Sequence, residues 1–158
     1  MSGAAKSMRT PAGYLMVLTE GDDLFAELEA LALREDIPSA SFTGFGFAGK
    51  VTFGFFDFAK RDYDPATFEN REMTGINGTL AWKDGKPSIH AHGVGGGPDF
   101  QVSGGHLLAL AVGRGSLEVT ISVHGTRLDQ RARHPAGTAR GALDRRQHPA
   151  PAFKLVFS

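Results

Sequence analysis

Three histidines near the middle of the chain are the residues whose type and spacing are most suited to chemistry. His90, His92 and His106 lie in the nineteen-residue stretch SIHAHGVGGGPDFQVSGGH and are three of the chain's six histidines. On a β-strand, residues i and i+2 point to the same face about 6.6 Å apart. The imidazoles of His90 and His92 can therefore converge on one metal ion without distortion of the backbone.

The third histidine joins this pair if the chain turns back symmetrically after His92. A turn centred on Asp99 sets His106 opposite His92, where cross-strand Cβ atoms lie about 4.5–5.5 Å apart. Three imidazoles with an open fourth position form the ligand set of catalytic zinc sites. The alternative is that each histidine hydrogen-bonds separately on a polar sheet face. The spacing favours a divalent metal site, with zinc as the expected ion, and leaves that alternative open.

Other polar residues have simpler interpretations. The Gly-Pro-Asp context of Asp99 favours a turn residue over a metal ligand. The glycines at 93–97 do not form a phosphate loop, because no helical pattern with Lys followed by Ser or Thr comes after them. His124 ends an alternating strand on its polar side, and we expect it on the surface. His134 and His148 each precede a proline, where we expect a loop.

The composition indicates one globular domain. Of the 158 residues, 41% are apolar and 22% charged, which suffices to bury a core without disulfides. There is no cysteine, so thiol catalysis and thiolate metal sites are excluded and any metal must be held by His, Asp or Glu. No apolar run reaches the roughly 18 residues of a membrane span, and the N-terminus lacks the apolar stretch of a signal peptide. We expect a cytoplasmic protein without a membrane partner.

The zero net charge hides an uneven distribution. Residues 1–126 carry 10 Lys and Arg against 15 Asp and Glu, about −5, whereas residues 127–158 carry 7 against 2, about +5. The arginines of the basic segment are Arg127, Arg131, Arg133, Arg140, Arg145 and Arg146. They can contact DNA phosphates, or they can form a solvated surface strap, which is the simpler interpretation because no aromatic residue lies among them.

Most of the local patterns are those of strands. Residues 14–18 form a short apolar run, and residues 22–36 have leucines at helical spacing after a cap at Asp22 or Asp23. From Ser39 onward apolar residues alternate and glycine interrupts them, with Val51, Phe53 and Phe55 on one face. The dipeptide Asp84-Gly85 predicts a hairpin that pairs residues 80–83 with 86–89. Residues 117–123 alternate most regularly, with Leu117, Val119, Ile121 and Val123 on one side.

Together these patterns predict an α+β fold, a mainly antiparallel β-sheet domain with one main helix near the N-terminus. We expect residues 1–158 to form a single domain with a core at 13–125. Residues 126–150 are expected to be an arginine-rich loop or strap, and residues 151–158 a closing strand.

Several of these stretches resemble the plants and prokaryotes conserved (PPC) domain. They are SASFTGFGFAGKVTFGFFD, ENREMTGINGTLAWKDGKPSIHAHGV, VSGGHLLALAV and SLEVTISVHG, which together cover roughly residues 13–125. The resemblance implies a two-layer α+β domain that assembles as a homotrimer. It also implies a link to DNA, since plant members carry AT-hooks and bacterial members are described as predicted DNA-binding proteins. An Arg-Gly-Arg-Pro AT-hook core is absent from this sequence, so that DNA role does not carry over.

The PPC domain is also similar in structure to acetolactate decarboxylase, which holds zinc with a His-x-His pair and one later histidine. This resemblance implies His90, His92 and His106 as the zinc ligands. Glu72, at the family's acidic strand position, is the candidate for a general acid or base; the alternative is a surface carboxylate paired with Arg71.

Two classes of function follow. In the first, the protein is a trimeric metal-binding module with a DNA-associated or regulatory role, and its DNA binding through the arginines is weak or non-specific. In the second, it is a zinc-dependent enzyme, decarboxylase- or hydrolase-like, acting on a small carboxylated compound with the metal as Lewis acid.

Overall fold

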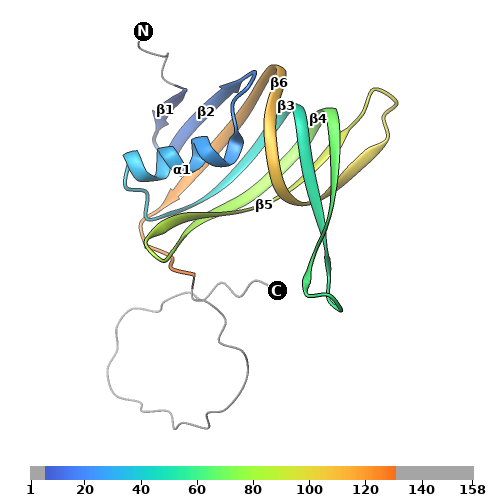
Figure 1. The fold of residues 1–158 in the computed structure, drawn as a ribbon. Helices are drawn as coiled ribbons and strands as arrows, with labels where there is room; N and C mark the ends of the chain where they lie inside the picture. Colours follow the sequence, from blue (N-terminus) through green and yellow to red (C-terminus); the bar gives the residue numbers. More distant parts are fainter. Residues whose placement is uncertain (1–5, 131–158) are drawn as a thin grey trace.

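Six antiparallel strands and one helix make up the part of the chain that the computed structural model describes, residues 6–130 (Figure 1). Three strands have 19, 22 and 23 residues, roughly three and a half to four times the five or six residues of an average strand. The elements are β1 (Ser7–Thr10), β2 (Gly13–Thr19), α1 (Leu24–Arg34), β3 (Ser39–Asp57), β4 (Asp62–Lys83), β5 (Lys86–Gly96) and β6 (Val102–His124).

The sheet closes on itself through its longest strand. The strand order is β1-β2-β6-β3-β4-β5, and β5 also pairs with β6, so that β6, β3, β4 and β5 form a ring. The first residues of β6, 102–106, pair with β5, and the later part of the strand pairs with β3 and β2. One strand therefore connects three neighbours, and the predicted mainly antiparallel α+β fold is confirmed.

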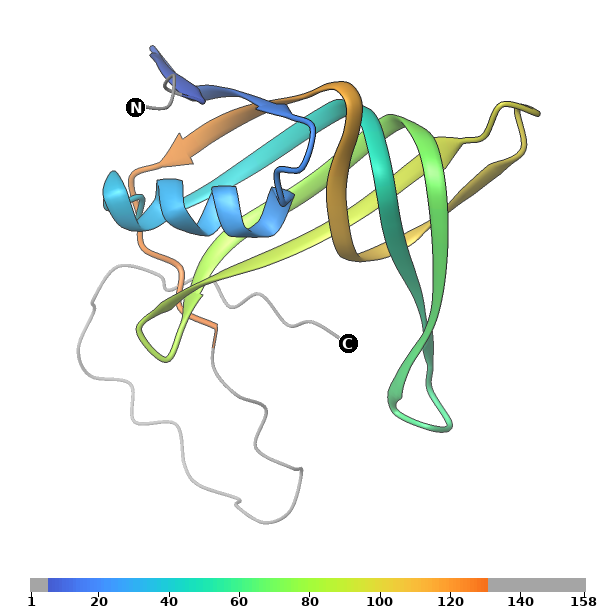
Figure 2. The same cartoon turned by 45° about the horizontal axis from the view of Figure 1, so that its top comes forward.

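The helix forms where the leucine pattern predicts it. Asp23 caps α1, because its side chain accepts a hydrogen bond from the backbone N–H of Ala26 at 2.9 Å. The helix is shorter than the predicted 22–36, since Glu35 is its C-terminal cap and Asp36 has a left-handed φ of 47°. Its buried side chains face the sheet, and they are Leu24, Leu28, Leu31 and Ala32. The helix lies across one face of the sheet, as Figures 1 and 2 show.

The hydrophobic core lies between α1 and the inner face of the sheet. On β6 the predicted inner residues Leu117, Val119 and Ile121 are buried. On β3, Val51 and Phe53 are buried, whereas Phe55 is exposed. Figures 1 and 2 show the reason, because the end of the β3–β4 hairpin extends beyond the body of the sheet. An apolar residue there has no core to enter.

Two predicted hairpins are confirmed. Lys83 pairs with Lys86 across Asp84-Gly85, and Leu80 pairs with Ile89. Farther along, β5 turns back through residues 97–101 into β6. The tip of this second hairpin also extends away from α1 (Figure 2).

Two further features stand apart from the predicted elements. Strand β1 was not predicted; it pairs with β2 along the outer edge of the sheet. The start of the loop predicted at residues 126–150 is hydrogen-bonded to the end of β4. The backbone N–H of Trp82 donates to the carbonyl oxygen of Leu128 at 2.8 Å, and the N–H of Gln130 donates to the carbonyl oxygen of Trp82 at 2.7 Å. The Arg127 guanidinium lies 3.9 Å from the centre of the Trp82 ring.

The rest of the basic segment and the predicted closing strand 151–158 lie outside the described residues. Within the described range, α1 is too short and too polar to cross a membrane.

Candidate metal centre

The pairing of β5 with β6 brings the three histidines together. His90 and His92 lie two residues apart on β5, and His92 pairs directly with His106 of β6, as the symmetric turn predicts. Gly104 permits this close pairing, because a Cβ there would lie 2.6 Å from the carbonyl oxygen of Gly93. The local sequence thus combines the three imidazoles with the small residues that let their strands approach.

The three imidazoles have the geometry of one binding site. The ring centroids are 5.2 Å apart for His90 and His92, 5.0 Å for His90 and His106, and 5.2 Å for His92 and His106. One nitrogen from each ring lies within 4.8 Å of the other two. With zinc–nitrogen bonds of about 2.0–2.1 Å, two ligands of a tetrahedral ion lie about 3.3 Å apart. Small side-chain rotations would suffice to bring one nitrogen of each ring to this separation.

The surroundings of His90 and His106 favour the neutral form of these two rings. His90 and His106 are partly buried, and this burial lowers the pKa of both imidazoles below the usual value. A positive charge on His92 lowers the pKa of His90 further, and positive charges on His90 and His92 do the same for His106. Because metal ions bind the neutral imidazole, these surroundings favour the ligand form at neutral pH.

One ring nitrogen of His106 lacks a hydrogen-bond partner among the described residues. This atom, Nδ1, is buried. Buried polar atoms are nearly always paired, so an unpaired one requires an explanation such as a bound ion. The ring itself is held by Tyr63, which stacks on it with centroids 4.5 Å apart and planes 18° from parallel. The residues present therefore fit a metal ion.

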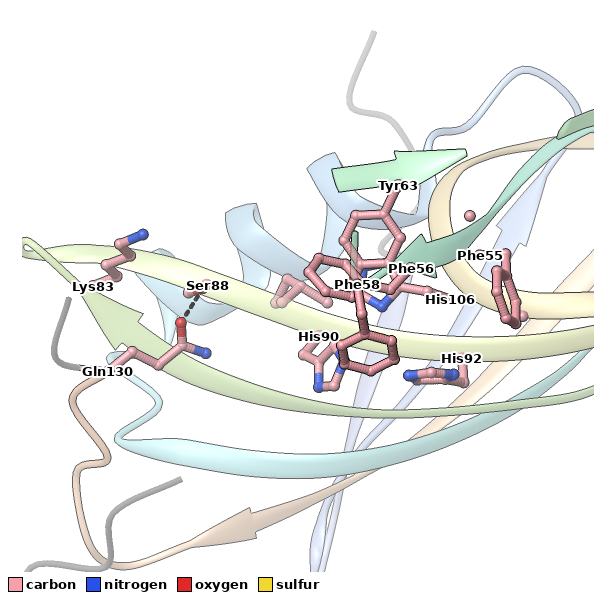
Figure 3. A pocket seen from close by; sticks show the side chains of 13 residues that line it. Phe55, Phe56, Phe58, Tyr63, Lys83, Ser88, His90, His92, His106 and Gln130 are labelled. Carbon is pink, nitrogen blue, oxygen red and sulfur yellow. Dashed lines mark hydrogen bonds between the residues drawn. The ribbon is translucent and has the colours of Figure 1, made fainter. Parts of the chain in front are cut away.

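A pocket of about 790 Å³ lies over the histidines (Figure 3). Side chains from four strands, from the turn between β3 and β4 and from the segment after β6 line it. They are Phe55, Phe56, Phe58, Tyr63, Lys83, Ser88, Ile89, His90, His92, His106 and Gln130, with Gly54 and Gly105. The Ser88 hydroxyl donates to the Gln130 side-chain oxygen at 3.1 Å. This hydrogen bond holds the segment after β6 against β5 at the edge of the pocket.

The other candidate residues lie elsewhere. Glu72 is exposed on β4, where it pairs with Phe47 and Gly96. Gly96 is four residues from His92 along β5, roughly 13 Å, and Glu72 does not line the pocket. The structure thus does not bring Glu72 to the histidines.

The polar residues with simpler interpretations behave as expected where the structure describes them. Asp99 is a turn residue, whose carboxylate accepts from the backbone N–H of Gln101 at 3.1 Å. His124 is exposed at the end of β6, as predicted. His134 and His148 lie outside the described residues.

Sequence reasoning missed the aromatic side of the pocket. Tyr63, Phe56 and Phe58 come from the β3–β4 hairpin, far from the histidines in sequence. A signal was present in the stretch FGFFDFAKRDYD, where adjacent phenylalanines point to opposite faces of a strand and stand beside charged residues. When only one face of a sheet packs against the core, one of two adjacent phenylalanines must point away from it.

Solved structures resemble this chain over most of its length. A candidate DNA-binding protein from Ralstonia eutropha is 55% identical, with 80% of this chain and 88% of that one covered and a TM-score of 0.78. A protein from Archaeoglobus fulgidus, described as metal-containing, is 28% identical over 73% of this chain and 82% of that one, with a TM-score of 0.67.

The predicted likeness to acetolactate decarboxylase is confirmed for the fold. The Bacillus subtilis enzyme is 17% identical, with a TM-score of 0.54 over 78% of this chain and 56% of that one. No curated protein matches the chain. The family model of the Plants and Prokaryotes Conserved (PCC) domain, abbreviated PPC above, matches residues 5–124. This match spans well over half of the chain, which therefore belongs to the Plants and Prokaryotes Conserved domain family.

Proposed function

We propose that this protein is a metal-binding module that holds one divalent ion, zinc by preference, through His90, His92 and His106. The observation that carries the proposal is the convergence of three imidazole nitrogens within 4.8 Å on two paired strands. Imidazole ligands in an open three-ligand set suit zinc. The metal-containing relative from Archaeoglobus fulgidus supports the same assignment.

The geometry supports ligand binding at this metal better than catalysis. A zinc-dependent enzyme acting on a small carboxylated compound needs an acid or base beside the metal. The described residues that line the pocket include no carboxylate, and Glu72 lies apart from it. The open fourth position of the ion is then a place for a ligand to bind.

Elemental analysis tests the metal site directly. Purified protein incubated with zinc and dialysed against metal-free buffer is expected to retain about one ion per chain, because three neutral ligands bind it in a partly buried pocket. Protein that retains no metal after this treatment would contradict the proposal.

We further propose that this protein binds DNA through the arginine-rich segment. The Ralstonia eutropha relative, a candidate DNA-binding protein, supports a DNA role. Among the described residues the one helix, α1, carries Glu27 and Glu29 against Arg34. An acidic helix is repelled by phosphates and does not read bases in the major groove. The contact is therefore expected to be electrostatic.

DNA binding is accordingly expected to be weak, independent of sequence and sensitive to salt. Affinity for labelled duplexes should fall by about an order of magnitude or more between roughly 50 and 200 mM salt, as counterion release requires. Replacement of Arg131, Arg133, Arg140, Arg145 and Arg146 by serine should abolish the binding. Tight binding at the higher salt that distinguishes one duplex sequence from another would contradict this prediction.

We also propose that the protein assembles as a homotrimer. The PPC resemblance implies this state, and exposed large apolar side chains at Leu33, Phe100 and Val102 offer surface that subunit contacts can bury. Light scattering at micromolar concentration is expected to give about 50 kDa, three times the 16.8 kDa of one chain. A stable particle of 16.8 kDa would contradict the trimer.

A further inference from the structure

The pocket over the histidines has two unlike ends. In Figure 3 the side chains of Lys83, Ser88 and Gln130 lie at one end, and Phe55 lies at the other, with the histidines between them. The polar end is held by the Ser88–Gln130 hydrogen bond. Phe56, Phe58 and Tyr63 lie between these ends, beside the histidines. A molecule that fills this pocket therefore meets aromatic surface beside the histidines and polar groups at one end.

The aromatic side reaches the metal site without interruption. Phe58 packs edge-on against Phe56 at 5.0 Å between centroids, and Phe56 packs edge-on against Tyr63 at 5.2 Å. Tyr63 in turn stacks on His106 at 4.5 Å. Such rings pack favourably on a further ring, either edge to face or offset. A ligand ring beside His106 would find this surface already formed.

Two of the phenylalanines that line the pocket face solvent. Phe55 is 77% exposed and Phe58 is 74% exposed, although both line the pocket. Large apolar side chains exposed together at the rim of a pocket are typical of ligand sites, because covering them removes apolar surface from water. The occupant is therefore expected to present an apolar group to these two rings.

The positive charge of the pocket favours a negatively charged group on the ligand. Among the described residues that line it, Lys83 alone has a fixed charge, and there is no carboxylate. A divalent ion on three neutral imidazoles adds further positive charge. This field attracts an anion, and a carboxylate oxygen is a ligand that zinc accepts at an open position.

We infer that the pocket binds a small carboxylate that carries an aromatic ring. The carboxylate takes the open position of the ion on His90, His92 and His106, and the ring lies against Phe55 and Phe58. A pocket of about 790 Å³ is within the size range of sites for such molecules. This inference rests on the proposed metal site and names the class of ligand that the site takes.

Titration calorimetry of the full chain loaded with zinc tests the inference with three probes. They are 3-phenylpropionate, propionate, which lacks the ring, and 3-phenylpropanamide, which lacks the charge. The first is expected to bind at least about tenfold more tightly than either of the others, since it alone satisfies both the metal and the aromatic side. Equal binding of 3-phenylpropionate and propionate would overturn the inference.

Substitution of the two exposed phenylalanines is a second test of the inference. Phe55→Ala and Phe58→Ala should each weaken binding of 3-phenylpropionate by about threefold to tenfold and leave binding of propionate unchanged. Phe45→Ala is the matched control, because Phe45 is also exposed on β3 but does not line the pocket. An equal effect of the control and the pocket variants would overturn the inference.

The zinc content of every sample separates the two proposals. Wild-type protein that retains zinc but shows no preference for the ring overturns the ligand class and leaves the metal site standing. Wild-type protein that retains no zinc overturns both.

Discussion

His92→Ala is expected to lower the affinity for zinc by about a hundredfold or more. In the proposed site this side chain is one of three ligands that the described residues supply. Loss of a supporting group beyond the ligands already costs about 10- to 100-fold in metal affinity. His92 is exposed, so its truncation leaves no cavity in the core. Competition with a chromophoric chelator measures the affinity, and elemental analysis after dialysis gives the amount of metal retained.

His124→Ala is the matched control for this variant. His124 is also an exposed histidine on a strand, but it lies at the far end of β6 from His106 and outside the cluster. The His124→Ala variant should bind zinc as wild type does. The thermal unfolding midpoints of metal-free wild type, His92→Ala and His124→Ala should be nearly identical. Equal zinc affinity of His92→Ala and wild type would contradict the three-histidine site.

Gly46→Ala is expected to destabilise the fold by about 3 kcal/mol or more, through backbone strain and a steric clash. Gly46 lies at an irregular point of β3, between its pairings with Met73 of β4 and Leu117 of β6. Its φ is +136°, and a Cβ there would lie 2.2 Å from the carbonyl oxygen of Ser116 and 2.7 Å from Cα of Leu117. Both atoms belong to the backbone of β6, which cannot move away without breaking the ring of strands.

Gly96→Ala is the control for the glycine variant. Gly96 lies near the end of β5, and a Cβ there would meet no atom within 4 Å. Its stability should remain within about 0.5 kcal/mol of wild type. Urea unfolding followed by circular dichroism compares the midpoints, and failure of Gly46→Ala to fold while Gly96→Ala folds also agrees with the expectation. Equal midpoints for the two variants would contradict the role assigned to Gly46.

Much of the fold follows from patterns that extend over fewer than about twenty residues. The capped leucine stripe of α1, the Asp84-Gly85 hairpin and the alternation in the last part of β6 are each local, and each was predicted. Local patterns work here because backbone periodicity and turn conformation depend on neighbouring residues.

The histidine cluster is predictable for the same reason. His90 and His92 share a face through strand periodicity, and His106 reaches them through one turn. The sequence therefore contains almost all of the information that brings the three histidines together.

The aromatic side of the pocket and the position of Glu72 were decided only by the tertiary structure. Tyr63 of β4 meets His106 of β6 because both strands pair with β3, and the contact joins residues 43 positions apart. The register of β3 against β6 shifts at irregular points such as Thr52/Phe53, and each shift changes which residues stand opposite one another. A one-residue shift in pairing moves side chains to the other face of a sheet. Long-range pairing and its irregularities arise from the closure of the whole sheet, so no local pattern reveals them.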